Sequence, residues 1–231
     1  MNNAHEPNSN QRRTFLKQVA TGAAVLGTGM IAAPFQSSAT QTNPDTSDAD
    51  EWFKQVKGKH RIIFDVSAPN GSSPFAWPRV FLMTNAKTGT PEKECGIVVV
   101  LRHSAIPYAM NNGLWEKYKF GELFKINDDT TKAPAVKNPF WEPKPGTFKI
   151  PGLGEVQIGI NELQASGVLF CVCDMALTVH SAVVAISTNQ DEATVKQEWL
   201  SGILPGVLVA PSGIWAVGRA QEHGCAYCFA G

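Results

Sequence analysis

Short apolar runs alternate with helical stretches along most of this chain, and this alternation constrains the fold more than any other feature. Five runs are predicted as β-strands, at residues 61–66, 96–101, 168–173, 207–210 and 225–229. Runs as uniformly apolar as Gly96–Leu101 fit strands that are buried on both faces. Such strands require a parallel sheet with helices covering it.

The stretches between these strands have helical character. Helices are predicted at residues 78–87, 106–118, 155–165, 175–187, 192–200 and 214–223. Repetition of strand, helix and strand predicts right-handed βαβ units. The expected fold class is therefore α/β: a doubly wound, mainly parallel five-stranded sheet with helices on both faces.

One stretch departs from the alternation. Residues 127–154 contain five prolines, at positions 134, 139, 143, 145 and 151, with Phe140 and Trp141 among them. Proline lacks the backbone N–H that a helix interior or a central strand needs. We therefore expect an irregular insertion at about 127–154 within a domain of residues 58–231. A lid, an oligomer arm and an ordinary ordered surface loop are all open interpretations of it.

The N-terminal 39 residues have the pattern of an export signal. Arg12-Arg13-Thr-Phe-Leu-Lys17 is followed by a weakly apolar run and then by Ser37-Ser-Ala39. A twin-arginine pair before such a run is the signature of the bacterial Tat pathway. The run at 19–35 is diluted by glycines and is shorter than the roughly 20 apolar residues of a membrane span.

We therefore predict a Tat signal peptide over residues 1–39 and a polar linker over 40–57. The Tat translocase would be a partner during export, and the protein would reside in the periplasm without a stable membrane span.

Composition excludes several classes of protein. The chain has 20 basic and 20 acidic residues, and without residues 1–39 it keeps 17 basic and 19 acidic ones, a net charge of −2. With no basic excess, bulk attraction to nucleic acid is not expected. An apolar fraction of 43% argues against intrinsic disorder. Five cysteines are too few for a disulfide framework in a chain of 231 residues.

Ligands of open α/β sheets bind beyond the carboxyl ends of the strands. Three predicted strands end in polar residues there, and these ends should converge if the sheet assembles as predicted. The strand at 96–101 is followed by Arg102, His103 and Ser104. The strand at 168–173 ends in Cys173 and is followed by Asp174, and the strand at 207–210 is followed by Pro211, Ser212 and Gly213. We take Cys173, Arg102 and His103 as the candidate catalytic residues, and Ser104, Asp174, Ser212 and Gly213 as candidate binding residues.

Cys173 is the most interesting of these residues because it lies where a strand gives way to a helix. Asp174 is the predicted N-cap. The free N–H groups and dipole of a helix N-terminus stabilise a thiolate, and Arg102 or His103 would add to that effect, whereas Asp174 would oppose it. The alternative is a buried cysteine that only packs. Cys171, deeper on the same strand face, is expected to be such a core residue.

The other cysteines give a less specific signal. Cys225 and Cys228 have the spacing of zinc or redox sites. They fall in a predicted strand, however, where residues three apart point to opposite faces. No metal or cofactor is expected, although disulfides or a metal site involving Cys95, Cys171, Cys225 and Cys228 remain open. His180, inside an apolar helix, is predicted to be a core residue.

Common enzyme motifs do not occur in the sequence. It contains no Gly-x-Gly-x-x-Gly, P-loop, Gly-x-Ser-x-Gly or His-Glu-x-x-His pattern. Nucleotide chemistry and triad hydrolysis therefore have no support from motifs.

Four segments together resemble the DsrE/DsrF-like proteins. They are Ile97-Val-Val-Val-Leu-Arg-His-Ser-Ala-Ile106, Gly167-Val-Leu-Phe-Cys-Val-Cys-Asp-Met-Ala-Leu177, Leu204-Pro-Gly-Val-Leu-Val-Ala-Pro-Ser-Gly213 and Gln221-Glu-His-Gly-Cys-Ala-Tyr227. The resemblance extends over about residues 61–229. This chain differs in having Ser104 where the family has glycine, a Tat signal, additional cysteines and the Pro-rich insertion.

The resemblance implies a small α/β domain that assembles into homo-oligomers or hetero-hexamers. In the sulfur-relay members, one cysteine after this strand carries a persulfide, and Cys173 occupies the matching position. The leading hypothesis is an exported protein that binds or relays sulfane sulfur through Cys173, with homo-oligomerisation and a sulfur donor or acceptor protein as expected partners. Any enzymatic activity would be that of a sulfurtransferase-like carrier. The alternatives are a non-enzymatic oligomeric module for a small ligand, and a thiol-disulfide or metal protein.

Overall fold

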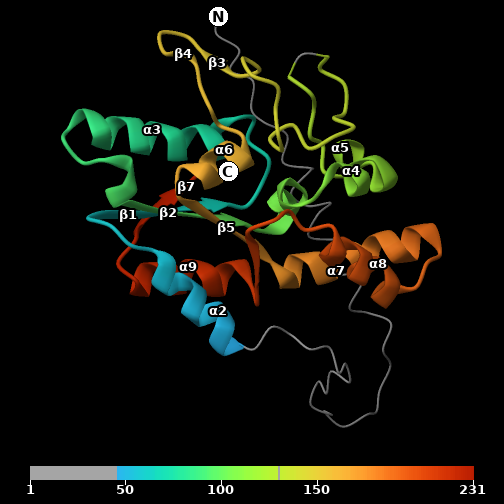
Figure 1. The fold of residues 1–231 in the computed structure, drawn as a ribbon. Coiled ribbons are helices and arrows are strands. Elements are labelled where there is room, and N and C mark those ends of the chain that lie inside the picture. The colour runs from blue at the N-terminus through green and yellow to red at the C-terminus, as the bar shows by residue number, and fades with distance from the viewer. Residues whose placement is uncertain (1–45, 130) are drawn as a thin grey trace, which may run out of the picture. The chain divides into compact units, whose positions relative to one another are not determined.

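A computed structural model describes residues 46–129 and 131–231 (Figure 1). The predicted Tat signal and the first part of the predicted linker lie outside these residues. Within the described residues, no helix is both long enough and apolar enough to cross a membrane.

Five parallel strands form the central sheet, in the order β6-β5-β2-β1-β7. Their bounds are β1 His60–Val66, β2 Cys95–Leu101, β5 Val168–Cys173, β6 Val207–Ala210 and β7 Ala226–Phe229. With helices flanking this sheet, the predicted doubly wound α/β fold is confirmed. A separate two-stranded hairpin, β3 (Lys149–Ile150) and β4 (Gly154–Glu155), lies in the Pro-rich insertion.

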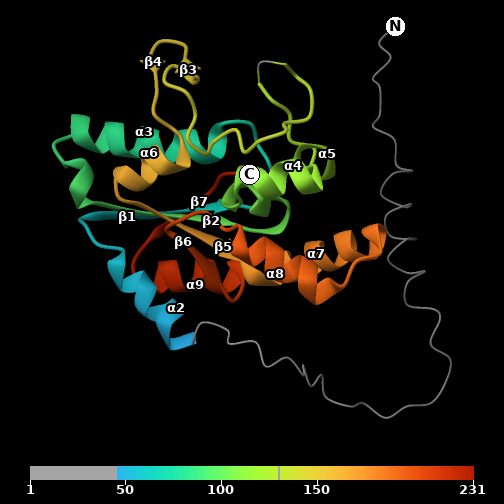
Figure 2. The ribbon, with the colours of Figure 1, turned by 45° about the vertical axis from the view of Figure 1, so that its right-hand side comes forward.

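Helices cover both faces of the sheet (Figures 1 and 2). α3 (Ser73–Lys87) and α6 (Ile160–Ala165) lie on one face, and α2 (Thr46–Trp52) and α9 (Gly213–Glu222) lie on the other. α7 (Asp174–Thr188) and α8 (Glu192–Ser201) lie side by side. The remaining elements are α4 (Asn112–Tyr118), α5 (Phe120–Leu123) and three short 3-10 helices: η1 (Phe53–Gln55), η2 (Glu92–Glu94) and η3 (His103–Ala109).

The central strand β2 shows why the apolar runs form a covered sheet. All of its residues are buried. Ile97 and Val99 pack into the core on the α3 side, while Val98 and Val100 pack into the core on the α9 side. Alternate side chains of a strand point to opposite faces, so a strand apolar at every position fills both cores.

Residues 46–55 differ from the prediction of a polar linker over 40–57, because they form α2 and η1. Phe53 is fully buried in the core on the α9 side. Its ring packs edge-on against that of Trp215, with centroids 5.8 Å apart. Phe53, together with the buried Ala49 and with Trp52, thus anchors a segment whose other residues are mostly polar.

Two predicted helices begin at other places. The helix expected at 78–87 begins at Ser73 as α3, with Pro78 inside it. Proline is favoured in the first turn, and Pro74 supplies that position. The helix expected at 155–165 begins only at Ile160, because residue 155 belongs to β4. Gly159 is the N-cap of this helix, and its N–H donates to the Glu162 carboxylate at 2.8 Å.

The helix expected at 106–118 is divided into η3 and α4. Pro107 lies within η3, and Asn111 caps α4 by accepting the N–H of Leu114 at 3.0 Å. Asparagine competes with helical backbone bonds and favours such caps, so the chain starts a new helix there.

The described part of the Pro-rich insertion is irregular apart from the β3–β4 hairpin, and it contains no helix, as predicted. Phe140 anchors it to the domain. The Phe140 ring is buried and stacks on Phe75 of α3, with centroids 4.1 Å apart. This contact fixes the base of the insertion to the core on the α3 side.

We predict that Phe53→Ala lowers the free energy of unfolding by about 3–5 kcal/mol, because it leaves a cavity in a closed core. Phe229→Ala is the matched control, since Phe229 is 58% exposed on β7 and its truncation should change stability little. Urea unfolding of both variants followed by circular dichroism measures the difference. Equal losses for the two variants would contradict the packing of residues 46–55 on the domain.

Candidate functional site

The carboxyl ends of β2, β5 and β6 are adjacent because these strands are neighbours in the sheet. Leu101 pairs with Val172, so Arg102 leaves β2 at the level of Cys173. α9 begins directly against Arg102: a Cβ placed on Gly213 would lie 2.5 Å from the Arg102 Cβ. The structure thus brings three of the candidate residues, Arg102, Cys173 and Gly213, to one edge of the sheet.

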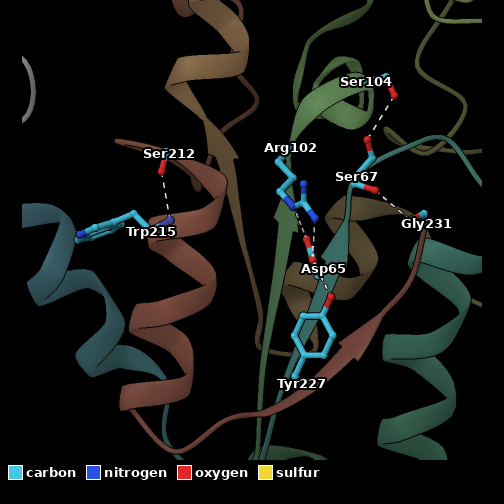
Figure 3. Close-up of polar contacts among 8 residues, drawn as sticks. All are labelled: Asp65, Ser67, Arg102, Ser104, Ser212, Trp215, Tyr227 and Gly231. Atoms are coloured by element: carbon cyan, nitrogen blue, oxygen red, sulfur yellow. Dashed lines mark hydrogen bonds and ion pairs between the residues drawn. The ribbon is translucent and has the colours of Figure 1, made fainter. Parts of the chain in front are cut away.

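An ion pair fixes the Arg102 side chain (Figure 3). Its Nε and Nη2 donate to the two carboxylate oxygens of Asp65, at 2.6 and 2.9 Å. The Asp65 side chain is 4% exposed and that of Arg102 is 24% exposed. The Tyr227 hydroxyl donates to the same carboxylate at 2.8 Å. A buried carboxylate needs such donors, and here three of them converge on it.

These contacts act on the charge states of the donors. The hydrogen bond to Asp65 is the main cause that raises the pKa of Arg102. The hydrogen bond to Asp65 is also the main cause that raises the pKa of Tyr227. Arg102 therefore stays cationic and Tyr227 stays a neutral donor at neutral pH.

Asp65 and Tyr227 were not among the residues singled out from the sequence. Asp65 did give a signal, because it is an acid inside the apolar strand 61–66, and a buried acid needs partners. Tyr227 ends one of the segments of the family resemblance, but its contact with Asp65 could not be predicted, because that contact depends on β7 pairing with β1.

Cys173 caps α7 with its own sulfur. Its Sγ accepts the backbone N–H of Ala176 at 3.3 Å. The prediction of Asp174 as N-cap is therefore wrong: Asp174 is the first residue of α7, and its carboxylate lies 3.0 Å from Lys196 Nζ on α8. Cys173 is 7% exposed, so only a small part of the residue reaches solvent.

Cys171 has a different environment on the same strand face. It is fully buried in the core on the α9 side. Burial raises the pKa of its thiol far above the usual range, since a thiolate there would lose its hydration. Cys171 is thus a neutral packing residue.

The other candidate residues have structural partners. The Ser104 hydroxyl donates to the Ser67 carbonyl at 3.2 Å, and the Ser212 hydroxyl accepts the Trp215 N–H at 3.1 Å as the cap of α9 (Figure 3). His103 has a positive φ of 50°, and its ring lies 5.9 Å from that of His180 on α7. These contacts order the strand ends around Arg102.

His180 is half-buried, and its ring also lies 5.1 Å from that of Phe124. Burial is the larger cause that lowers the pKa of His180, and nearby His103 adds to it. His180 is therefore neutral at pH 7.

All five cysteines are free thiols in the structure. Cys225 packs into the core on the α9 side, whereas Cys228 packs against the core on the α3 side. The two sulfurs therefore point to opposite faces of the sheet.

Comparisons with known proteins add little to this geometry. No protein-family model and no curated protein matches the chain. Among solved structures, a protein of unknown function from Methanobacterium thermoautotrophicum is similar, at 16% identity with a TM-score of 0.39. The match covers 74% of this chain and 99% of that one.

We predict that Asp65→Asn lowers the free energy of unfolding by about 1.5–3 kcal/mol, because it removes charge-assisted hydrogen bonds from a buried group. Asp50→Asn is the control, since the side chains of Asp50 and its partner Arg219 are 50% and 37% exposed, and ion pairs near the surface contribute about 0–1 kcal/mol. Urea unfolding at pH 7 measures both. A loss for Asp65→Asn no larger than for Asp50→Asn would contradict a structural role for the buried ion pair.

Proposed function

We propose that this chain is an exported DsrE-like protein that binds or relays sulfane sulfur as a persulfide on Cys173. The observation that carries the proposal is the hydrogen bond from the Ala176 N–H to the Cys173 sulfur at the start of a 15-residue helix. Backbone N–H groups at a helix N-terminus, with the helix dipole behind them, stabilise negative charge on an atom at that position.

The charged groups nearest to Cys173 along the chain and at the sheet edge, Asp174 and Arg102, each have a partner of opposite charge. Arg102 lies at the same edge of the sheet and interacts electrostatically with Cys173. Asp174 opposes negative charge there, but the Lys196 ammonium, whose side chain is only 13% exposed, offsets that carboxylate. The Asp174 carboxylate is therefore already paired.

The proposed chemistry needs no oxidant or metal. The Cys173 thiolate attacks the outer sulfur of a polysulfide or persulfide, and a new S–S bond forms to Cys173 while the S–S bond of the donor breaks. The electron pair of the broken bond leaves with the remaining donor thiolate. A thiolate on an acceptor then attacks the outer sulfur of the Cys173 persulfide and returns Cys173 to a thiolate.

The small exposure of Cys173 favours a small sulfur donor over a bulky one. It also favours the second candidate function, a small-ligand module in which Cys173 only packs. Export through the Tat pathway is part of the first proposal and rests on the twin-arginine pattern of residues 12–17.

We predict that the chain gains mass in steps of one sulfur atom when treated with polysulfide, and that Cys173→Ser abolishes most of that gain. Intact-mass spectrometry before and after reduction measures it. Cys228→Ser is the control, because Cys228 is the most exposed of the other four cysteines. Uptake by Cys173→Ser equal to that of the wild type would overturn the proposal in favour of the small-ligand module.

We further predict that Lys196→Gln slows sulfur uptake at Cys173 by about two- to fivefold at low salt, because it leaves the Asp174 carboxylate unpaired beside the sulfur. The difference should shrink in high salt, which screens partly exposed charges. Lys117→Gln, which removes a lysine paired with Glu198, is the control. An unchanged rate for Lys196→Gln would show that the Asp174 charge does not reach the reacting sulfur.

A further inference from the structure

Two histidines from separate elements contact each other beside the sheet edge that carries Cys173. His103 begins η3, directly after Arg102, and His180 lies on α7. Their rings are nearly perpendicular, with centroids 5.9 Å apart. η3 packs against both β5 and α7, so this ring contact joins two segments that border Cys173.

The backbone at His103 favours release of this contact. Its φ of 50° lies in the left-handed region, which costs energy for a residue other than glycine. His103 is exposed, and its Nδ1 lies 3.3 Å from the hydroxyl oxygen of the adjacent Ser104. Contacts with neighbouring elements, including the His180 ring, therefore hold the start of η3 in place.

His180 lies on the same side of α7 as Cys173. It follows Cys173 by seven residues, which is about two helical turns and about 10 Å along the axis. Residues with this spacing share one side of a helix. Cys173 is only 7% exposed, so a small movement of η3 against α7 is enough to change the access of reagents to its sulfur.

The surroundings of His180 suit a neutral imidazole and not a charged one. The ring is half-buried, and that of Phe124 packs on it with centroids 5.1 Å apart. Burial is the larger cause that lowers the pKa of His180, and nearby His103 adds to it. Protonation therefore costs the ring its hydration and, when His103 also carries a proton, places two like charges in contact.

The other titratable groups on the elements around His180 are exposed, neutral or already paired. They are Arg102 and Tyr108 at η3, Asp174 on α7, Lys119, Glu122 and Lys125 at α5, and Glu192, Lys196 and Glu198 on α8. His103 is thus the group that responds most directly to a proton on His180.

We propose that the contact between His103 and His180 is an acid-sensitive latch that regulates access to Cys173. With neutral rings, η3 stays packed against α7 and the sulfur is nearly covered. The latch is at full strength above the usual histidine pKa of about 6.5 and weakens as the pH falls from there toward the lowered pKa of His180. Its role in sulfur uptake rests on the proposed function, whereas the movement itself does not.

Hydrogen–deuterium exchange of the full chain tests the movement at about pH 7.5 and about pH 5.5, on either side of the histidine range, with rates corrected for the intrinsic effect of pH. The Ala105 N–H, bonded to the Arg102 carbonyl at 3.0 Å, reports on η3. The η3 amides should exchange about two- to fivefold faster in acid, the range for a charge interaction near the surface.

His180→Phe should abolish this acid response, because a phenyl ring keeps the packing on Phe124 but takes up no proton. His180→Gln, which is also neutral, should have the same effect and guards against a packing artefact of the larger ring. The matched control is His223→Phe. His223 also stacks on a phenylalanine, Phe53, with centroids 6.1 Å apart, and its replacement should leave the response of η3 unchanged.

Alkylation of Cys173 by iodoacetamide, located by peptide mapping, tests access to the sulfur. The ratio of the wild-type rate to the His180→Phe rate cancels the loss of thiolate in acid and should rise about two- to fivefold at the lower pH. A constant ratio overturns the link to Cys173. An η3 exchange rate that ignores pH, or that responds equally in His180→Phe, overturns the latch itself. If the latch opens but Cys173 takes up no sulfur from polysulfide, the proposed function fails and the movement stands.

Discussion

The ion pair between Asp65 and Arg102 is the interaction on which the arrangement of this sheet edge depends. It joins β1 to the end of β2, and Tyr227 adds β7 through a third hydrogen bond to the same carboxylate. Two charges removed from water need good geometry and full satisfaction to be tolerated. The bidentate contact and the phenol meet that condition. Through Tyr227, β7 thereby helps to hold the Asp65 carboxylate that positions Arg102.

The same pairing limits what Arg102 can do for Cys173. Asp65 neutralises most of the guanidinium charge, so the pair acts on the sulfur as a dipole more than as a free cation. The proposed sulfur chemistry therefore depends mainly on the short-range bond from the Ala176 N–H to the sulfur. The ion pair between Asp174 and Lys196 also matters for Cys173. Without Lys196, the Asp174 carboxylate would oppose negative charge on the sulfur and offset the effect of the Ala176 N–H.

The parts of the fold that follow from local pattern could be predicted from the sequence. Gly96–Leu101 is apolar at every position, which is the pattern of a strand buried on both faces. Helix starts were predicted less well, because Pro74 and Pro78 compete for one first turn and Asn111 begins a new helix inside an apolar stretch. Residues 46–55 were missed because only Ala49, Trp52 and Phe53 carry their packing among mostly polar neighbours.

The residues of the candidate site likewise include some that local sequence patterns predict and some that depend on long-range strand pairing. Cys173 and Arg102 could be found because Cys173 ends one apolar strand and Arg102 follows another, and the carboxyl ends of parallel strands meet at one edge of the sheet. The contact between Asp65 and Tyr227 joins residues 162 positions apart in the chain. It depends on β7 adding next to β1, and no local pattern at either residue specifies that pairing.

Helix α7 begins directly after Cys173 and has one side exposed to solvent. Its buried residues occupy only one side of the helix. The helix begins at the sulfur it stabilises, so its direction is set by the end of β5, and that direction leaves Val179 and Val183 exposed.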